Sequence, residues 1–150
     1  MVTLSSTDVR EIYDLRAALE GRAARSLARQ RDPAALAELR ATLDAIAEAA
    51  AAGDVRAVAR FDLAFHESLC RLSGNRRLHT VFQRHVPALQ TLIKLDEYLD
   101  RSLSEITAQH EPILAAILAG DAERAAATCE AHCDEARDLV ADYIDHLPAH

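Results

Sequence analysis

Apolar residues recur every three or four positions in six successive segments of this 150-residue chain. This spacing turns one side of each segment toward a core, as in amphipathic helices. No segment shows the alternation of apolar and polar residues that is typical of strands. Alanine, leucine, arginine and glutamate, which favour helix, are abundant. The sequence therefore predicts an all-α fold, an antiparallel bundle of about six helices.

Turn and cap residues predict where the helices begin and end. Asp8 is expected to cap a first helix that runs to about residue 30. Asp32-Pro33 combines a cap with a proline at the first helical position, and Gly53 is expected to end the second helix. Pro87 falls inside the fourth helix, where it is expected to kink the helix or break it in two.

The charge and composition exclude several functions. A formal net charge of -7 argues against direct binding of nucleic acid, which requires a basic surface. No run of 18 apolar residues occurs, so no membrane span is expected, and no signal peptide is visible. Three cysteines, an odd number, suit a reducing cytoplasm better than a disulfide framework.

Four polar side chains are predicted to lie on apolar helix faces. Asp62 and His66 are four residues apart in FDLAFHESLCRL, so they share one helix face. His110 and His132 lie in the centres of the apolar stripes of the fifth and sixth helices. Polar groups in a core need partners, and hydrogen bonds among themselves would be enough for each one alone. Together, one carboxylate and three imidazoles indicate a divalent metal site, with zinc favoured and nickel, manganese or iron as alternatives.

Three more polar residues lie on apolar stripes and are candidates for binding a small molecule. Arg16 and Glu20 fall in the middle of the stripe of the first helix. They form either an internal ion pair or an anion-binding site that faces a cavity. His85 lies on the stripe of the fourth helix and is either a hydrogen-bonded core residue or part of a pocket.

Other metal sites and enzyme motifs fit less well. Di-iron bundles need Glu-x-x-His pairs, and no glutamate in this chain has a histidine three residues later. Cys129, His132 and Cys133 could form a thiolate zinc site, but small buried cysteines in an alanine-rich helix explain them more simply. The sequence also lacks an HExxH motif, a P-loop and a glycine-rich dinucleotide loop.

Three motifs together resemble one known family. They read YDLRAALEGRAARSLA, FDLAFHESLCRLSGN and QHEPILAAILAGDAERAAATCEAH. The first motif is similar to the family's first helix, which carries an Arg and a Glu. The second is similar to its Asp-x3-His followed by a glycine-asparagine turn. The third is similar to its later His, followed by a Gly-Asp turn and a final His. The chain thus resembles the FCD domain, the effector-binding C-terminal domain of FadR-type GntR-family bacterial transcription regulators. The resemblance covers nearly the whole chain.

The resemblance implies a site and a function. The metal ligands would be Asp62, His66, His110 and His132, around a central cavity that holds both metal and effector. The effector would be a small organic acid or sugar acid, and the domain would form a homodimer. Residues 1–7 would be a linker remnant before a sensing domain at residues 8–147. DNA would be bound only through a winged helix-turn-helix domain that this chain lacks.

The resemblance also implies that the chain is not an enzyme. A metal-dependent hydrolase, in which the metal activates water, remains the alternative. Glu20 is then the candidate for the general base.

Overall fold

A computed structural model describes residues 3–100 and 102–148 and confirms the all-α prediction. Within these ranges there are six helices and no strand. They are α1 (Ser6–Gln30), α2 (Pro33–Ala51), α3 (Val55–Leu72), α4 (Arg76–Asp100), α5 (Leu103–Leu118) and α6 (Ala122–Asp145). No helix in the described part of the chain is both long and apolar enough to cross a membrane.

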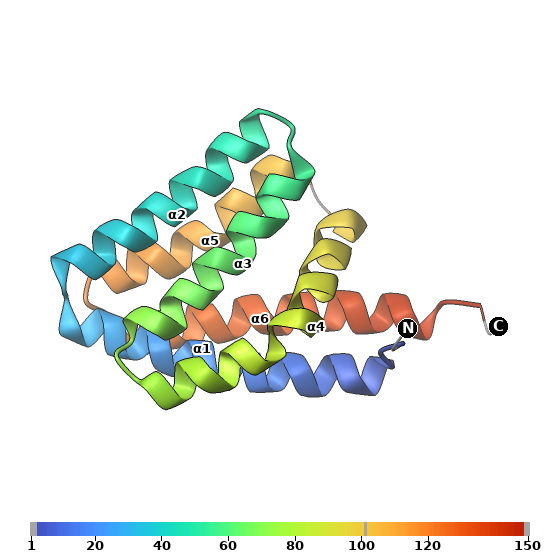
Figure 1. Cartoon of the computed structure of the whole chain (residues 1–150), viewed down its shortest axis with the longest axis horizontal. Coiled ribbons are helices and arrows are strands. Elements are labelled where there is room, and N and C mark those ends of the chain that lie inside the picture. Colours follow the sequence, from blue (N-terminus) through green and yellow to red (C-terminus); the bar gives the residue numbers. More distant parts are fainter. Residues whose placement is uncertain (1–2, 101, 149–150) are drawn as a thin grey trace.

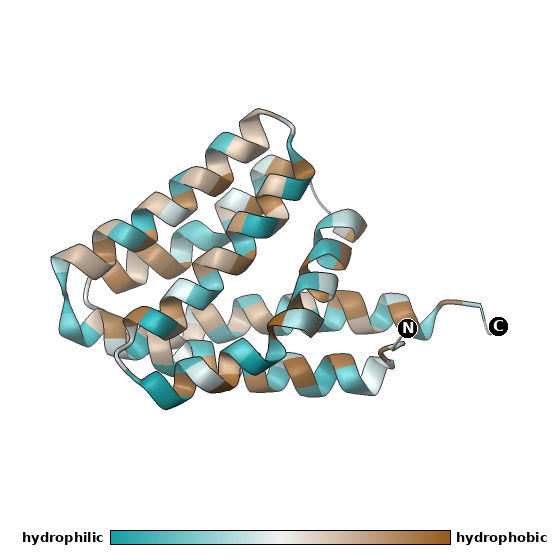
Figure 2. Cartoon of the chain, viewed as in Figure 1, coloured by the Kyte–Doolittle hydropathy of each residue, from teal (hydrophilic) through white to brown (hydrophobic). Residues whose placement is uncertain are grey.

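The helices pack in two groups (Figure 1). Helices α1 and α6 lie side by side and antiparallel, and their interface is the most extensive in the molecule. Helices α2, α3 and α5 form the second group, in which α2 packs against both of the others. Polar and apolar residues alternate around each ribbon, as expected of amphipathic helices in a bundle (Figure 2). The main apolar core lies where α1 meets the second group.

The start of α1 differs from the expectation. Ser5, not Asp8, is the N-cap, and the helix begins three residues earlier than predicted. Asp8 occupies the third helical position, where its carboxylate accepts hydrogen bonds from the backbone N–H of Ser5 (2.8 Å) and from its hydroxyl (2.6 Å). This reciprocal arrangement is a capping box, and it places part of the supposed linker at residues 1–7 in the helical domain. Residues 1 and 2 of that linker lie outside the described ranges.

Pro87 bends α4 without ending it. The helix is continuous across the proline, and Figure 1 shows it turning in its middle so that its second half approaches the first turns of α3. Pro87 is exposed, so the backbone groups that it leaves without helical partners are close to solvent. A cavity lies between the first half of α3 and the second half of α4, beyond the bend.

Candidate metal centre

The structure brings the three predicted histidine ligands together, and the fourth candidate, Asp62, contacts two of them. Asp62 and His66 come from α3, His110 from α5 and His132 from α6. One ring nitrogen from each histidine lies within 4.8 Å of the other two. Asp62 Oδ1 lies 2.9 Å from Nε2 of His110 and 3.1 Å from Nε2 of His66. The two Nε2 atoms are themselves 3.1 Å apart.

These distances fit the ligands of a single ion. Neighbouring ligands at about 2.1 Å from a metal are about 3.0 Å apart in octahedral and about 3.4 Å apart in tetrahedral geometry. The triangle formed by Asp62, His66 and His110 has sides of 2.9 to 3.1 Å. The ring of His132 stacks on that of His66, with centroids 5.3 Å apart, and lies 4.6 Å from that of His110. The donor set therefore suits a divalent metal.

The outer nitrogens of two imidazoles are held by other groups, which turns their Nε2 atoms toward the centre. His66 donates from Nδ1 to Glu20 Oε1, and His110 donates from Nδ1 to the backbone oxygen of Ile106 at 2.6 Å. Phe65 packs edge-on against both rings, at centroid distances of 5.4 and 5.2 Å. Such outer partners fix the tautomer and orientation of metal-binding histidines.

The charges of the centre are tightly coupled. Burial alone would raise the pKa of Asp62, but the neighbouring imidazoles hold it well below its usual range. Burial and Arg16 lower the pKa of His66, yet Glu20 and Asp62 outweigh them and raise it to about 9. Burial and the adjacent imidazoles put the pKa of His132 well below its usual range, so this ring is neutral and ready to coordinate.

Arg16 and Glu20 form the internal ion pair that the sequence allowed. Their side chains are 3% and 0% exposed, and Arg16 Nε lies 2.5 Å from Glu20 Oε2. The other oxygen of Glu20 accepts the hydrogen bond from His66. Because both oxygens are engaged, Glu20 is poorly placed to act as the base of a hydrolase. The prediction that Arg16 and Glu20 bind an effector stays open beside this structural role.

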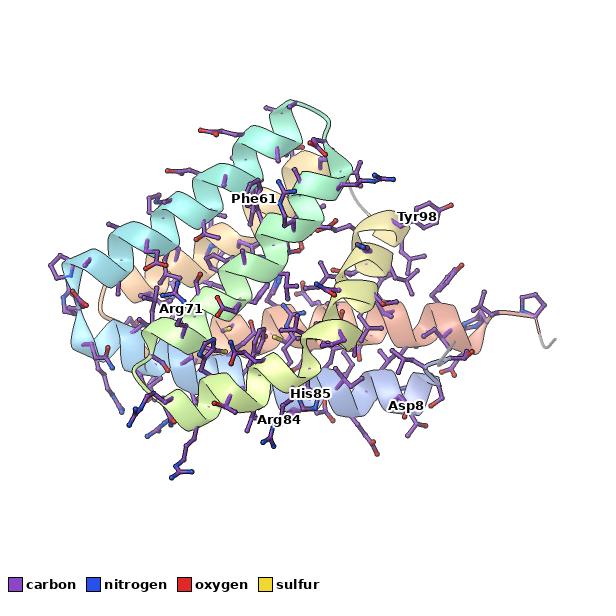
Figure 3. All side chains as sticks on the ribbon, in the orientation of Figure 1. Asp8, Phe61, Arg71, Arg84, His85 and Tyr98 are labelled. Carbon is purple, nitrogen blue, oxygen red and sulfur yellow. The ribbon has the colours of Figure 1, made fainter. Side chains whose placement is uncertain are left out.

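The remaining sequence candidates lie outside the donor triangle. His85 is half-buried near the middle of α4, and its Nδ1 donates to the backbone oxygen of Val81 at 2.9 Å (Figure 3). This contact fits the core-residue interpretation, and its pocket role stays a prediction. Cys129 and Cys133 are fully buried. The hydrogen bond with Cys133 and burial raise the pKa of Cys129 well above its usual range, which favours a protonated thiol over a zinc-binding thiolate.

Sequence reasoning missed Glu97, a buried carboxyl group on α4. It is 6% exposed, and neither of its oxygens has a hydrogen-bond partner among the described residues. Burial and the nearby charge of Asp62 raise its pKa to about 9. The signal was present in the sequence, because Glu97 follows the buried residues Leu89 and Ile93 at intervals of four along the same stripe.

The fold and the site define an all-α domain with a histidine-rich centre. The profile of the FCD domain matches residues 11–135, and the chain belongs to the FCD domain family. It is 32% identical over 122 residues to a protein of Paenarthrobacter nicotinovorans named "Probable D-xylose utilization operon transcriptional repressor". The match covers 81% of this chain and 53% of that protein.

A solved structure of a GntR protein from Streptococcus agalactiae has the same fold. It superposes with a TM-score of 0.70 at 25% sequence identity, over 87% of this chain and 58% of that one. The chain therefore spans little more than half the length of either relative.

Proposed function

We propose that this chain is the effector-sensing domain of a GntR-type transcription regulator. In this proposal Asp62, His66, His110 and His132 hold one divalent ion, with zinc favoured over nickel, manganese or iron. A small organic acid or sugar acid then binds at that ion. The observation that carries the proposal is the triangle of buried donors with sides of 2.9 to 3.1 Å. The regulator names of both relatives support it.

Each part of the centre has a separate task. The bound ion would supply positive charge for the carboxylate of the effector. Glu20 orients His66, and the backbone oxygen of Ile106 orients His110. The buried guanidinium of Arg16 lies close enough to interact electrostatically with Asp62, so its charge acts on the same region. Arg16 is therefore our candidate for a second contact to the anionic effector.

The helices that supply the ligands give a route for signalling. Ligands on α3, α5 and α6 tie three helices to one point, so effector binding would change how these helices pack. DNA binding would then change in a domain outside this chain, since the acidic chain itself has a net charge of -7. A cytoplasmic homodimer without enzymatic activity completes the proposal. Light scattering measures the oligomeric state, and a monomer at micromolar concentration would contradict the proposed homodimer.

The direct test measures metal and acid binding on the purified chain. We expect elemental analysis to find one divalent ion per chain, which His110→Ala removes. His79→Ala is the matched control, because this histidine pairs with Glu67 instead of lying in the centre. A thermal-shift panel of organic and sugar acids should stabilise the metal-loaded chain and not the chelated chain. If chelation changes neither the melting temperature nor acid binding, the proposal is wrong.

A further inference from the structure

A cavity of about 690 Å³ lies between α3 and the part of α4 that follows its bend. It is lined by side chains of α3 and α4, and Ala59, Leu63 and Tyr98 are among the apolar ones. Figure 3 shows Tyr98 on the last turns of α4, pointing away from the helix bundle. Three exposed cations also line it: Arg56, Arg60 and Lys94. Such positive charge favours the entry of an anion over that of a cation.

Glu97 is the buried polar residue in the wall of this cavity. A carboxyl group without a hydrogen-bond partner is costly inside a protein and calls for an explanation. Glu97 cannot be explained by a local ion pair, because neither oxygen has a partner among the described residues. After burial, the strongest influence on its pKa comes from Asp62, one of the candidate metal ligands. Glu97 therefore belongs to the wall of the cavity and also interacts with a candidate ligand of the metal centre.

A hydroxyl group fits an unpaired carboxyl group in this position. It can donate to an ionised carboxylate and accept from a protonated one, so it satisfies Glu97 in either state. An ammonium group would also match a carboxylate, but it would have to pass the three cations that line the cavity. An acid with a hydroxyl beside its carboxylate suits both the cations that line the cavity and the unpaired carboxyl group of Glu97.

We infer that Glu97 is a specificity-determining residue, which selects effectors with a hydroxyl group next to the carboxylate that binds the metal. The effector reaches the metal centre through the cavity between α3 and α4. Its carboxylate lies on the metal side of Glu97, and its hydroxyl pairs with the Glu97 side chain. This inference rests on the proposed function and adds to it the feature by which effectors are distinguished.

The test compares acetate, glycolate and glycine, which differ only in the substituent next to the carboxylate. Each is titrated calorimetrically into the zinc-loaded chain. We expect glycolate to bind about two- to tenfold more tightly than acetate, the size of one hydrogen bond to a neutral carboxyl group. Glu97→Ala should abolish this preference while leaving acetate affinity and zinc content unchanged. Glu97→Gln should keep part of it, since an amide still donates and accepts.

Glu135→Ala provides the control, because it removes an exposed carboxylate from α6. It should leave the ratio of glycolate to acetate affinity unchanged. A Glu97→Ala variant with the wild-type ratio would overturn the inference, and so would a preference for glycine. Loss of zinc from Glu97→Ala would also overturn it, since Glu97 would then support the metal. If the zinc-loaded wild type binds none of the three acids, the proposed function itself fails.

Discussion

Replacing Glu20 by glutamine tests the link between the buried ion pair and the metal centre. Glu20 is fully buried and serves two partners, Arg16 through Oε2 and His66 through Oε1. Glutamine keeps the shape and an oxygen for His66, but it removes the charge that Arg16 needs. Removing one partner of a buried pair leaves an uncompensated charge, which costs about 3–5 kcal/mol. For a domain of this size that corresponds to a loss of about 6–20 °C in melting temperature.

The same substitution should weaken metal binding. Outer partners of metal-bound histidines contribute about ten- to a hundredfold in affinity. Melting followed by circular dichroism gives the stability, and competition with a chromophoric chelator gives the zinc affinity. The double variant Arg16→Met, Glu20→Gln separates the two effects, because it removes the orphaned charge without restoring the carboxylate.

We expect the double variant to recover most of the lost stability and none of the lost zinc affinity. Wild-type melting of Glu20→Gln would refute the argument from the buried pair. A double variant as unstable as the single one would show that Arg16 is not the source of the loss. Unchanged zinc affinity in both variants would refute the orienting role of Glu20.

Four further predictions follow from the described structure. The pKa of His66 is raised to about 9, so zinc must displace its proton at neutral pH. Zinc affinity should then rise about tenfold per pH unit from pH 7 toward 9, and a flat profile in calorimetric titrations would contradict this. Phe65→Ala should lower the free energy of unfolding by about 3–5 kcal/mol in urea melts, because the ring is fully buried against two imidazoles. Gly120→Ala should cost about 1–3 kcal/mol, since φ is +71° there. Gly21→Ala should change stability by less than about 1 kcal/mol, because the side chain that it meets, Glu130, is exposed and can move aside.

The sequence predicts the helices well because its signals are local. The Asp32-Pro33 start of α2, its end just before Gly53 and the place of Pro87 inside α4 all agree with the structure. The cap of α1 was wrong because Ser5 and Asp8 are both good N-cap residues. Only the reciprocal hydrogen bonds of a capping box show which of them occupies that position. Whether Pro87 bends or breaks α4 depends on packing against other helices, which no local pattern contains.

The candidate ligands could be proposed from the sequence, and their surroundings could not. Polar residues on apolar stripes identify Asp62 and the histidines as inward-facing, and family resemblance groups them. Spacing along one helix cannot show that Glu20 reaches across to His66, a contact between residues 46 positions apart. Nor can it show that Glu97 lies near Asp62, because this depends on the bend at Pro87. The raised pKa of His66 depends on the contact with Glu20 across helices and on Asp62 in its own helix.

The spread of the centre along the chain has a consequence for folding kinetics. His66, His110 and His132 lie on three different helices, and Glu20 lies on a fourth. The site therefore exists only after nearly the whole bundle has assembled, so metal cannot act as an early nucleus. Interactions that form after the transition state slow unfolding and leave the folding rate almost unchanged. A bound ion would thus slow the unfolding of a bundle that has already assembled, and it would lengthen the lifetime of the folded domain.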